Sequence, residues 1–581
     1  MLYQRKDSLN AGSLSEARES RINFRRVGTT RQKRTLAIWS ASLLSLDVFF
    51  IIWLLNPRHL VSSGTVLNTS LSILGFICVL VIELTRIYQG VSIAFFAHKA
   101  VDPIPQIPEK GKRVAILTTI VPSKEPVQIV RRTLQAMKQI YYAGQVDVWI
   151  LDEGNSPEVK VLAAELGVKH FSRKGIETYN QPSGTYRAKS KSGNHNAWRA
   201  EYEHEYDYVA QMDPDHTPFS NFLERTLGYF NDPDTGFVVA PQVYGNQDQG
   251  WLTKAAAAQS YIFHAILQRG ANSFGSPLLI GTNHVYRTVA WHQIGGYQDC
   301  VIEDHLTSMK LHGTINQATG KHWKGVYAPD IISIGEGPSS WTDYFNQQKR
   351  WAYGIWEIIL HHSRKLDRHL SAGQSFYYAA LQFFYPSVAL VWILGAIVSM
   401  LYFFDGIKSL AVSDVDWFIV WGLSLGLQIG LFMWLNIFNL TYAERKYKGL
   451  DALLLTLMTA PIYVSAGLTA LARISLTYAV TAKGELRSFD TIATFKSHLY
   501  WAILGSLFIV FGIALHHTMA TQIFWDSFTL AISGLPAVFI LLTQYLSGHF
   551  VFGSMKYIAK EIVHQYVPKA RKKTSAAAIL H

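Results

Sequence analysis

Long apolar stretches near both ends of this chain enclose a polar block at residues 98–370. A helix needs roughly 20 apolar residues to cross the hydrocarbon core of a bilayer. Stretches that approach or exceed this length lie at 36–55, 68–88, 379–404, 416–440, 498–515 and 527–547. Hydrophobic residues make up 49% of the chain and charged residues only 16%, against roughly a quarter in soluble domains. We therefore expect an α-helical transmembrane domain of about six spans, with one large domain inserted after the second span.

The basic residues are grouped beside these apolar stretches. The net charge is +12, and such an excess can serve nucleic acid, anionic lipid or phosphate-bearing substrates. Placement beside membrane spans indicates cytosolic anchors among membrane lipids and no nucleic-acid partner. We therefore expect both termini and the block 98–370 on the cytosolic side of the plasma (inner) membrane, in a multi-pass protein. The grouped residues are Arg18, Arg21, Arg25, Arg26, Arg31, Lys33, Arg34, Arg445, Lys446, Lys448, Lys569, Arg571, Lys572 and Lys573.

A further apolar run covers 451–475. If it crossed the membrane, the segment after it would lie outside together with the basic C-terminal tail, against the distribution of positive charge. We interpret it as an interfacial or re-entrant helix, with a seventh span as the alternative.

Asp47 and Glu83 lie inside predicted spans, where charge is costly. They either pair with neighbours or line a polar pathway, and pairing is the simpler interpretation. The two cysteines, Cys78 and Cys300, lie in an apolar span and in the polar block, which supports neither a disulfide framework nor a zinc site.

The polar block begins with the pattern of a parallel α/β unit. Residues 114–118 are typical of a buried strand, apolar residues follow at helical spacing over 127–137, and a second strand is expected at 146–151, ending at Asp152. Ligands in such sheets bind beyond the carboxyl ends of the strands. Asp152 is therefore a candidate for nucleotide binding, although an Asp at this place is often only a turn residue.

A third strand, at 208–212, is followed by Asp213-Pro214-Asp215. Two carboxylates that flank one residue can face the same divalent cation, Mg²⁺ or Mn²⁺, and such a cation can help a diphosphate to leave. A second pair, Asp232-Pro233-Asp234, stands between an expected helix at 222–230 and an expected strand at 237–240. We interpret that pair as a turn.

Three further segments carry suitable chemistry. The basic, glycine-containing segment 189–196 includes Lys191 and could contact phosphate, but alone it is more typical of a solvated loop. Glu303-Asp304 could take a proton from an attacking hydroxyl. In Gln347-Gln348-Lys349-Arg350-Trp351, the arginine suits phosphate and the indole ring suits a sugar face, although each residue alone has a plainer explanation.

Taken in order, these residues resemble the D, D-x-D, E-D, Q-x-x-R-W pattern of processive family-2 glycosyltransferases of the cellulose synthase-like superfamily, bacterial β-glucan synthase type. Residues 191–194 are similar to the A-K-A-G-N segment of that family, and 478–484 (Tyr-Ala-Val-Thr-Ala-Lys-Gly) to its gating-loop motif. The resemblance covers roughly 36–550. It implies an α/β cytosolic GT-A (Rossmann-like) glycosyltransferase domain inserted in the transmembrane domain.

With the apolar stretches, the resemblance gives an expected division of the chain. We expect a basic cytosolic tail at 1–35, two transmembrane helices at 36–97, the catalytic domain at 98–370, two helices at 371–446, the interfacial helix at 447–475, the gating loop at 476–496, two helices at 497–550 and a second basic cytosolic tail at 551–581.

The resemblance also implies a role for each motif residue. Asp304 is the general base and Glu303 its catalytic neighbour, while Trp351 borders the acceptor end of the polymer. Asp213 and Asp215 hold the metal. Binding of the nucleotide sugar is implied for Asp152, Lys191, Asp213, Gln347, Arg350, Thr481 and Lys483.

The implied reaction is a single inverting displacement that polymerises glucose from a UDP-glucose donor into a β-glucan with β-1,4, β-1,3 or mixed linkage. The nascent polysaccharide is expected to leave through a channel between the spans, with accessory export proteins as further partners. Departures from the family pattern leave sugar and linkage open. They lie at Ile302, at 279–284 (Leu-Ile-Gly-Thr-Asn-His) and at 123–126 (Ser-Lys-Glu-Pro).

Alternative functions are a mannan, chitin-like or hyaluronan-like synthase and a non-processive lipid-phosphate glycosyltransferase. The second is disfavoured because such enzymes generally lack the Q-x-x-R-W and gating motifs. A transporter with a cytosolic regulatory domain would explain the spans but not the carboxylates at strand ends.

Overall fold

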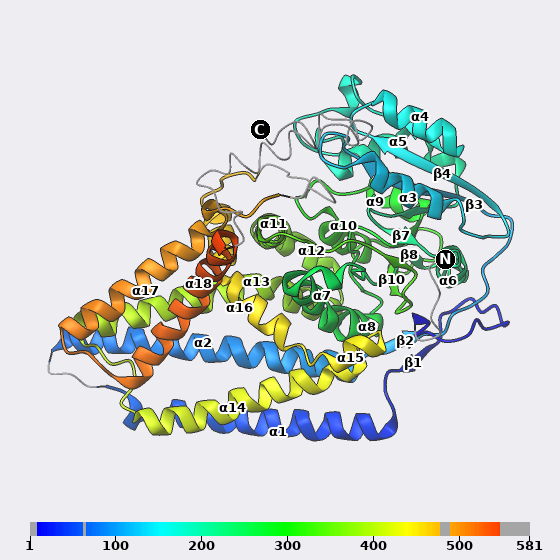
Figure 1. The fold of residues 1–581 in the computed structure, drawn as a ribbon. Coiled ribbons are helices and arrows are strands. Elements are labelled where there is room, and N and C mark those ends of the chain that lie inside the picture. Colours follow the sequence, from blue (N-terminus) through cyan, green and yellow to red (C-terminus); the bar gives the residue numbers. More distant parts are fainter. Residues whose placement is uncertain (1–7, 62–64, 477–487, 547–581) are drawn as a thin grey trace, which may run out of the picture.

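The computed structural model describes residues 8–61, 65–476 and 488–546. An α/β domain lies at one end of a bundle of long helices, as Figure 1 shows. The predicted insertion of one large domain between the second and third apolar helices is confirmed, because the sheet is built from residues 113–327.

A seven-stranded mixed sheet forms the centre of the α/β domain, in the order β10-β8-β9-β6-β3-β4-β5. All neighbouring pairs are parallel except those of β9, which runs antiparallel to both β6 and β8. The strands are β3 (Arg113–Ile120), β4 (Gln145–Asp152), β5 (Lys169–Phe171), β6 (Tyr208–Gln211), β8 (Thr235–Val239), β9 (His284–Arg287) and β10 (Lys324–Tyr327). The strands expected from sequence at 114–118, 146–151, 208–212 and 237–240 are thus confirmed within two residues.

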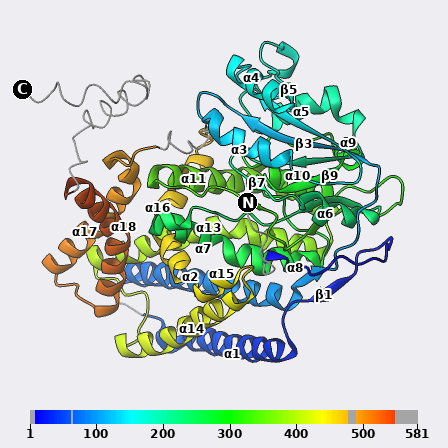
Figure 2. The same cartoon turned by 45° about the vertical axis from the view of Figure 1, so that its right-hand side comes forward.

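Helices cover both faces of this sheet (Figure 2). Successive residues of β3 show why: Val114 and Ile116 enter one hydrophobic core, and Ala115 and Leu117 enter the other. A strand that buries both faces must be apolar throughout, which is the pattern of a covered parallel strand. The helices of this domain include α3 (Val127–Met137), α4 (Pro157–Leu166), α5 (Lys191–Tyr202), α6 (Phe222–Thr226), α9 (Thr288–Ile294) and α10 (Glu303–His312).

Between the sheet and the long helices lies a layer of shorter helices. It consists of α7 (Trp251–Ile262), α8 (Gln268–Asn272), α11 (Trp341–Ile358) and α12 (Arg364–Leu366). Helix α11 carries the Gln347–Trp351 motif and packs against α13 and α16 of the helical bundle.

The long helices are α1 (Thr30–Leu54), α2 (Val66–Lys99), α13 (Ala372–Asp405), α14 (Asp414–Leu435), α16 (Leu450–Leu471), α17 (Lys496–Ala514) and α18 (Ala520–Leu546). By length and composition, six described helices could cross a membrane: α1, α2, α13, α14, α16 and α17, with α14 and α17 each extended by an adjoining 3₁₀ turn. Residues 527–546 of the predicted span 527–547 lie within α18, which is not among the six. Several spans begin with side-chain caps; Ser371, for example, forms a capping box with Gln374 at the start of α13.

Helix α16 differs from the other apolar helices in its surroundings. It packs against α7, α11 and α13. Its most apolar window is 61% buried, against 17–39% for the other five helices. This burial is compatible with an interfacial helix, and its place relative to the bilayer stays a prediction.

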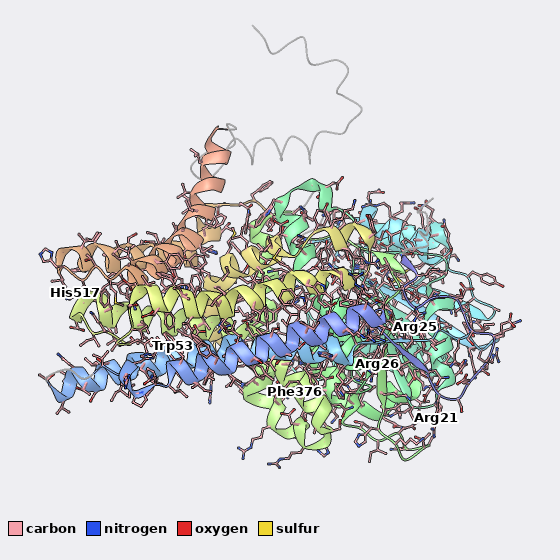
Figure 3. All side chains as sticks on the ribbon, turned by 90° about the horizontal axis from the view of Figure 1, so that it is seen from below. Arg21, Arg25, Arg26, Trp53, Phe376 and His517 are labelled. Atoms are coloured by element: carbon pink, nitrogen blue, oxygen red, sulfur yellow. The ribbon has the colours of Figure 1, made fainter. Side chains whose placement is uncertain are left out.

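The predicted N-terminal tail contains structure that the sequence did not indicate. Strand β1 (Phe24–Arg26) pairs with β2 (Val101–Pro103), just after α2. The Ala11 N–H donates to Asp330, whose carboxylate also pairs with Arg225 in the core. Figure 3 places Arg21, Arg25 and Arg26 at the α/β end of the bundle, and Trp53 and His517 toward the opposite end. Much of the segment before α1 is therefore part of the α/β domain.

Candidate functional site

The carboxyl ends of β4 and β6 bring two predicted site residues to one edge of the sheet. Both strands pair in parallel with β3, so both run toward the same edge. Asp152 ends β4, and Asp213 lies two residues beyond Gln211, the last residue of β6. This is the edge at which parallel α/β sheets bind ligands.

Asp152 is completely buried and its carboxylate is engaged within the protein. It accepts hydrogen bonds from the N–H groups of Gly154 and Ser156 at 2.8 and 2.5 Å, and its Oδ2 lies 3.2 Å from His170 Nε2. These contacts fix the turn after β4. Binding of the nucleotide sugar by Asp152 stays a prediction.

Lys191 begins helix α5, which corrects the solvated-loop interpretation of 189–196. Ser190 caps the helix by accepting from the Gly193 N–H, and residues 192–198 are buried. Helix α5 therefore directs its N-terminal amide groups toward this edge of the sheet, an arrangement that favours anions. The Lys191 ammonium donates to the Asp213 carboxylate and, at 2.5 Å, to the Gly281 carbonyl.

A buried arginine supports this part of the site. The Arg173 guanidinium pairs with Glu153 and donates to the carbonyl oxygens of Arg187 and Ser190 at 2.9 and 3.0 Å. It therefore ties the residue after Asp152 to the cap of the helix that carries Lys191. No motif marks Arg173 in the sequence.

Asp213, Asp215 and His216 form a candidate divalent-metal site. One potential ligand atom from each residue lies within 4.8 Å of the others. His216 Nδ1 lies 3.2 Å from Asp215, and its buried Nε2 has no hydrogen-bond partner in the part of the chain that the structure describes. Carboxylate and imidazole donors suit Mn²⁺, and the two carboxylates also suit Mg²⁺. Sequence reasoning missed His216, although it directly follows the second carboxylate.

The adjacent carboxylates Glu303 and Asp304 begin helix α10. Removal from water raises the pKa of Asp304 to about 7, and the charge of Glu303 contributes to the rise. Removal from water also raises the pKa of Glu303, while the positive charges of Lys191 and Arg350 oppose that rise. A carboxylate that changes protonation near neutral pH suits a general base.

Gly281 lies between Asp304 and Lys191, the lysine that pairs with Asp213. It has a φ of +72°, and a Cβ atom at this position would lie 3.3 Å from Asp304 Oδ2 and 3.9 Å from Lys191 Nζ. The segment 279–284, singled out as a departure from the family pattern, therefore lies directly between the predicted base and the predicted donor contact.

Helix α11 places the Q-x-x-R-W residues beside Asp304. Gln347 and Trp351 are one helical turn apart, and both line a cavity together with Asp304. Glu357, later on the same helix, accepts from the Val301 N–H at 3.1 Å and contacts Cys300 Sγ at 3.2 Å. Glu357 thereby fixes the turn before Glu303, a role that no sequence motif indicated.

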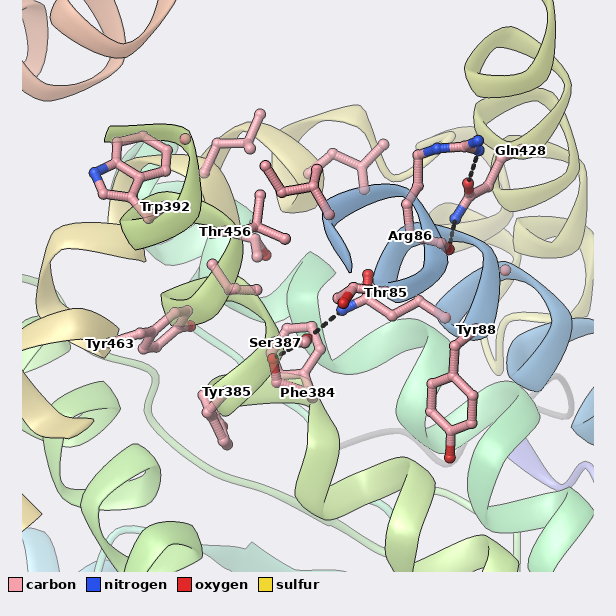
Figure 4. A pocket seen from close by; sticks show the side chains of 18 of the residues that line it. Thr85, Arg86, Tyr88, Phe384, Tyr385, Ser387, Trp392, Gln428, Thr456 and Tyr463 are labelled. Atoms are coloured by element: carbon pink, nitrogen blue, oxygen red, sulfur yellow. Dashed lines mark hydrogen bonds between the residues drawn. The ribbon is translucent and has the colours of Figure 1, made fainter. Parts of the chain in front are cut away.

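The cavity beside Asp304 has a volume of about 1190 Å³ and continues into the helical bundle. Its wall beyond Trp351 is mainly aromatic and apolar, and part of it appears in Figure 4. The aromatic residues along it include Tyr385, Trp392, Tyr463, Trp501, Phe508 and Trp525.

Asp47 and Glu83 are both paired within the bundle, which was the simpler interpretation, and Glu83 also lines the cavity. Arg86 bonds Glu83 at 2.7 Å and lies 3.7 Å from Asp47. It also donates to Gln428 at 2.8 Å, the contact drawn in Figure 4. Thr481 and Lys483, by contrast, lie outside the described residues, and their predicted contact with the donor stays a prediction.

A comparison with protein families identifies this arrangement. The model described as Glycosyl transferase family group 2 matches residues 208–551, which is more than half of the chain. The chain belongs to this glycosyltransferase family. The predicted family resemblance, the fold class and the enzyme class are therefore confirmed.

Named relatives include a cellulose synthase subunit and a probable mannosyltransferase. The chain is 28% identical over 49% of its length to a cellulose synthase catalytic subunit (UDP-forming) from Xanthomonas axonopodis pv. citri, covering 37% of that protein. It is 26% identical over 42% of its length to a probable glucomannan 4-beta-mannosyltransferase from Oryza sativa subsp. japonica, covering 42% of that protein. These alignments span less than half of either relative.

Among solved structures, the mannosyltransferase PcManGT from Pyrobaculum calidifontis, in complex with GDP-Man and Mn²⁺, is 12% identical to this chain. It matches 69% of this chain and all of its own length with a TM-score of 0.44.

Proposed function

We propose that this glycosyltransferase is a processive, inverting β-glucan synthase that polymerises glucose from UDP-glucose and moves the product across the membrane. The observation that carries the proposal is the continuous cavity that borders Asp304 and Trp351 and extends between α13, α14, α17 and α18. A product that enters such a cavity need not dissociate between additions.

In the proposed reaction, Asp304 takes the proton from the attacking hydroxyl of the terminal sugar. The hydroxyl oxygen forms a bond to the anomeric carbon of the donor while the bond from that carbon to the diphosphate oxygen breaks. An α-linked donor therefore gives a β-linkage. UDP leaves with the electron pair of the broken bond.

Positive charge offsets the charge of the leaving diphosphate. Lys191 and Arg350 lie near enough to Glu303 to affect its pKa, so both can act at the centre of the site. Mg²⁺ or Mn²⁺ held by Asp213, Asp215 and His216 would supply further neutralisation of the diphosphate when bound.

The proposed membrane arrangement follows from the basic residues and the fold. Arg21, Arg25 and Arg26 lie at the α/β end of the bundle, which we assign to the cytosolic side of the plasma (inner) membrane. The product would then leave at the end of the bundle that carries Trp53 and His517.

A β-mannan synthase is the second candidate, because the probable glucomannan mannosyltransferase matches nearly as much of this chain as the cellulose synthase subunit does. A panel of labelled sugar nucleotides, followed by digestion with linkage-specific glycosidases, separates the candidates. The proposal predicts glucan from UDP-glucose. Polymer from GDP-mannose alone would favour the second candidate, and a short product on a lipid carrier would contradict processive synthesis.

A further inference from the structure

Three buried polar side chains behind the Gly281 carbonyl have no role in the reaction described above. Gln211, His284 and Tyr297 are respectively 1%, 1% and 4% exposed. They come from β6, from β9 and from the turn after α9. Buried polar groups are costly unless they are hydrogen-bonded, so a continuous network of three needs an explanation.

The contacts form a series of hydrogen bonds that ends on the Gly281 carbonyl. Gln211 Nε2 donates to that carbonyl at 3.1 Å, and the Tyr297 hydroxyl lies 2.7 Å from Gln211 Oε1. His284 Nε2 lies 2.9 Å from the same hydroxyl. On its other side, the Gly281 carbonyl accepts from Lys191 Nζ at 2.5 Å.

The protons available on Gln211, Tyr297 and His284 fix the direction of each hydrogen bond in this series. Gln211 donates through its nitrogen, so its oxygen accepts the single Tyr297 hydroxyl proton. The Tyr297 oxygen must therefore accept from His284, which requires a proton on Nε2. His284 Nδ1 is then the unprotonated nitrogen, and its distance of 3.4 Å to the Thr282 carbonyl oxygen is longer than an ordinary hydrogen bond. Burial and the charge of Lys191 lower the pKa of His284 to about 3, so the ring is neutral at working pH. Donors then run from His284 through Tyr297 and Gln211 to Gly281, and bonds aligned in this way strengthen one another.

The loop that these hydrogen bonds support has two residues in the left-handed backbone conformation. Gly281 and Asn283 have φ angles of +72° and +52°. The Asp213 N–H donates to Thr282 Oγ1 at 3.0 Å, and Asn283 donates to the Pro241 carbonyl at 3.1 Å. A non-glycine residue in the left-handed region persists only where surrounding contacts hold it.

We propose that His284, Tyr297 and Gln211 are positioning residues that fix the Gly281 carbonyl and, through it, hold the Lys191 ammonium against the donor diphosphate. The inference rests on the proposed glycosyl transfer and adds a specific device to it. The three residues do not touch substrate. They act through Gly281 and Lys191, at the loop where this chain departs from the family pattern.

Tyr297→Phe in the purified full chain tests the proposal, because it removes only the hydroxyl. Loss of one buried hydrogen bond predicts a kcat for nucleoside diphosphate release that is about three- to tenfold lower. The donor KM should change by less than about twofold. The displaced Lys191 ammonium should mainly weaken stabilisation of the negative charge that develops as the diphosphate leaves, and this charge is absent when the donor first binds. His284→Leu should act alike, and His284→Gln, which can still donate, should recover much of the rate.

Tyr327→Phe is the matched control, because the Tyr327 hydroxyl is also buried but has no hydrogen-bond partner among the described residues. It should leave kcat unchanged, and thermal unfolding in detergent should show all variants folded. If Tyr297→Phe and Tyr327→Phe have equal kcat while the wild-type protein turns over donor, the positioning role is wrong and the proposed function stands. A wild-type protein that releases no nucleoside diphosphate overturns both.

Discussion

The backbone of Gly281 lies against the carboxylate of Asp304, such that a Cβ atom on Gly281 would be 3.3 Å from Asp304 Oδ2. We expect the acceptor hydroxyl to approach the proposed base through the space that the absent side chain leaves. Gly281→Ala should therefore reduce kcat strongly, by at least about tenfold.

Gly320→Ala separates crowding of the site from backbone strain. Gly320 has the same φ of +72°, but nothing lies within 4 Å of a Cβ atom added there. Both substitutions should lower stability by about 1 kcal/mol, and only Gly281→Ala should affect synthesis. Equal activity of the two variants would show that the space beside Asp304 is not needed.

The raised pKa of Asp304 predicts the pH dependence of synthesis. The base acts in its deprotonated form, and its pKa is about 7. Below that value, kcat/KM should fall by about tenfold per pH unit, and above it the rate should level off. The same shift makes charging of Asp304 unfavourable to folding, so its contribution to stability is full below its ordinary pKa of 3.8 and is lost as pH rises from there to about 7. A rate independent of pH between about 5 and 8 would contradict Asp304 as the base.

The metal site predicts a graded response to substitution. Asp213→Asn with Asp215→Asn should weaken metal-dependent donor binding, measured by titration of Mn²⁺ in the presence of labelled donor. His216→Ala should raise the Mn²⁺ concentration needed for half-maximal activity by about tenfold or more. An unchanged metal requirement in His216→Ala would restrict the site to the two carboxylates.

Glu357 is outside the motifs, but it should affect the rate through the hydrogen bond that it accepts in the turn before Glu303. Glu357→Ala removes the acceptor for the Val301 N–H and should lower kcat, whereas Glu357→Gln keeps a carbonyl oxygen and should retain more activity. Glu165→Ala, which removes an exposed partner of Arg131, is the control and should be silent. Equal rates for Glu357→Ala and wild type would mean that the turn before Glu303 is held by other contacts.

Local patterns predicted much of the fold. The apolar run of β3 and the helical spacing of α3 depend on neighbouring residues, so the sequence places both within a few residues. Asp213 was found because it follows a strand. The competing Asp232-Pro233-Asp234 does form the predicted turn, where Asp232 accepts from the Asp234 N–H and pairs with Lys324.

Features formed by distant segments could not be predicted in this way. Arg173 donates to the backbone carbonyl oxygens of residues 179, 187 and 190. Every residue has a backbone carbonyl, so the residue types at these positions do not indicate such contacts. The pairing of β1 with β2 joins segments separated by a whole helical hairpin. The polarity of Lys191 suggested a loop, but Ser190 caps a helix there and tertiary packing buries its first turns.

The most direct test of the account is polymer synthesis by wild type and Asp304→Asn in lipid nanodiscs, with labelled UDP-glucose and Mg²⁺ or Mn²⁺. Wild type should release UDP and form a polymer that β-glucan-specific glycosidases digest. Asp304→Asn should bind UDP-glucose with nearly unchanged affinity and form no polymer. Near-normal synthesis by Asp304→Asn, or no nucleoside diphosphate release by wild type from any common sugar nucleotide, would contradict the account.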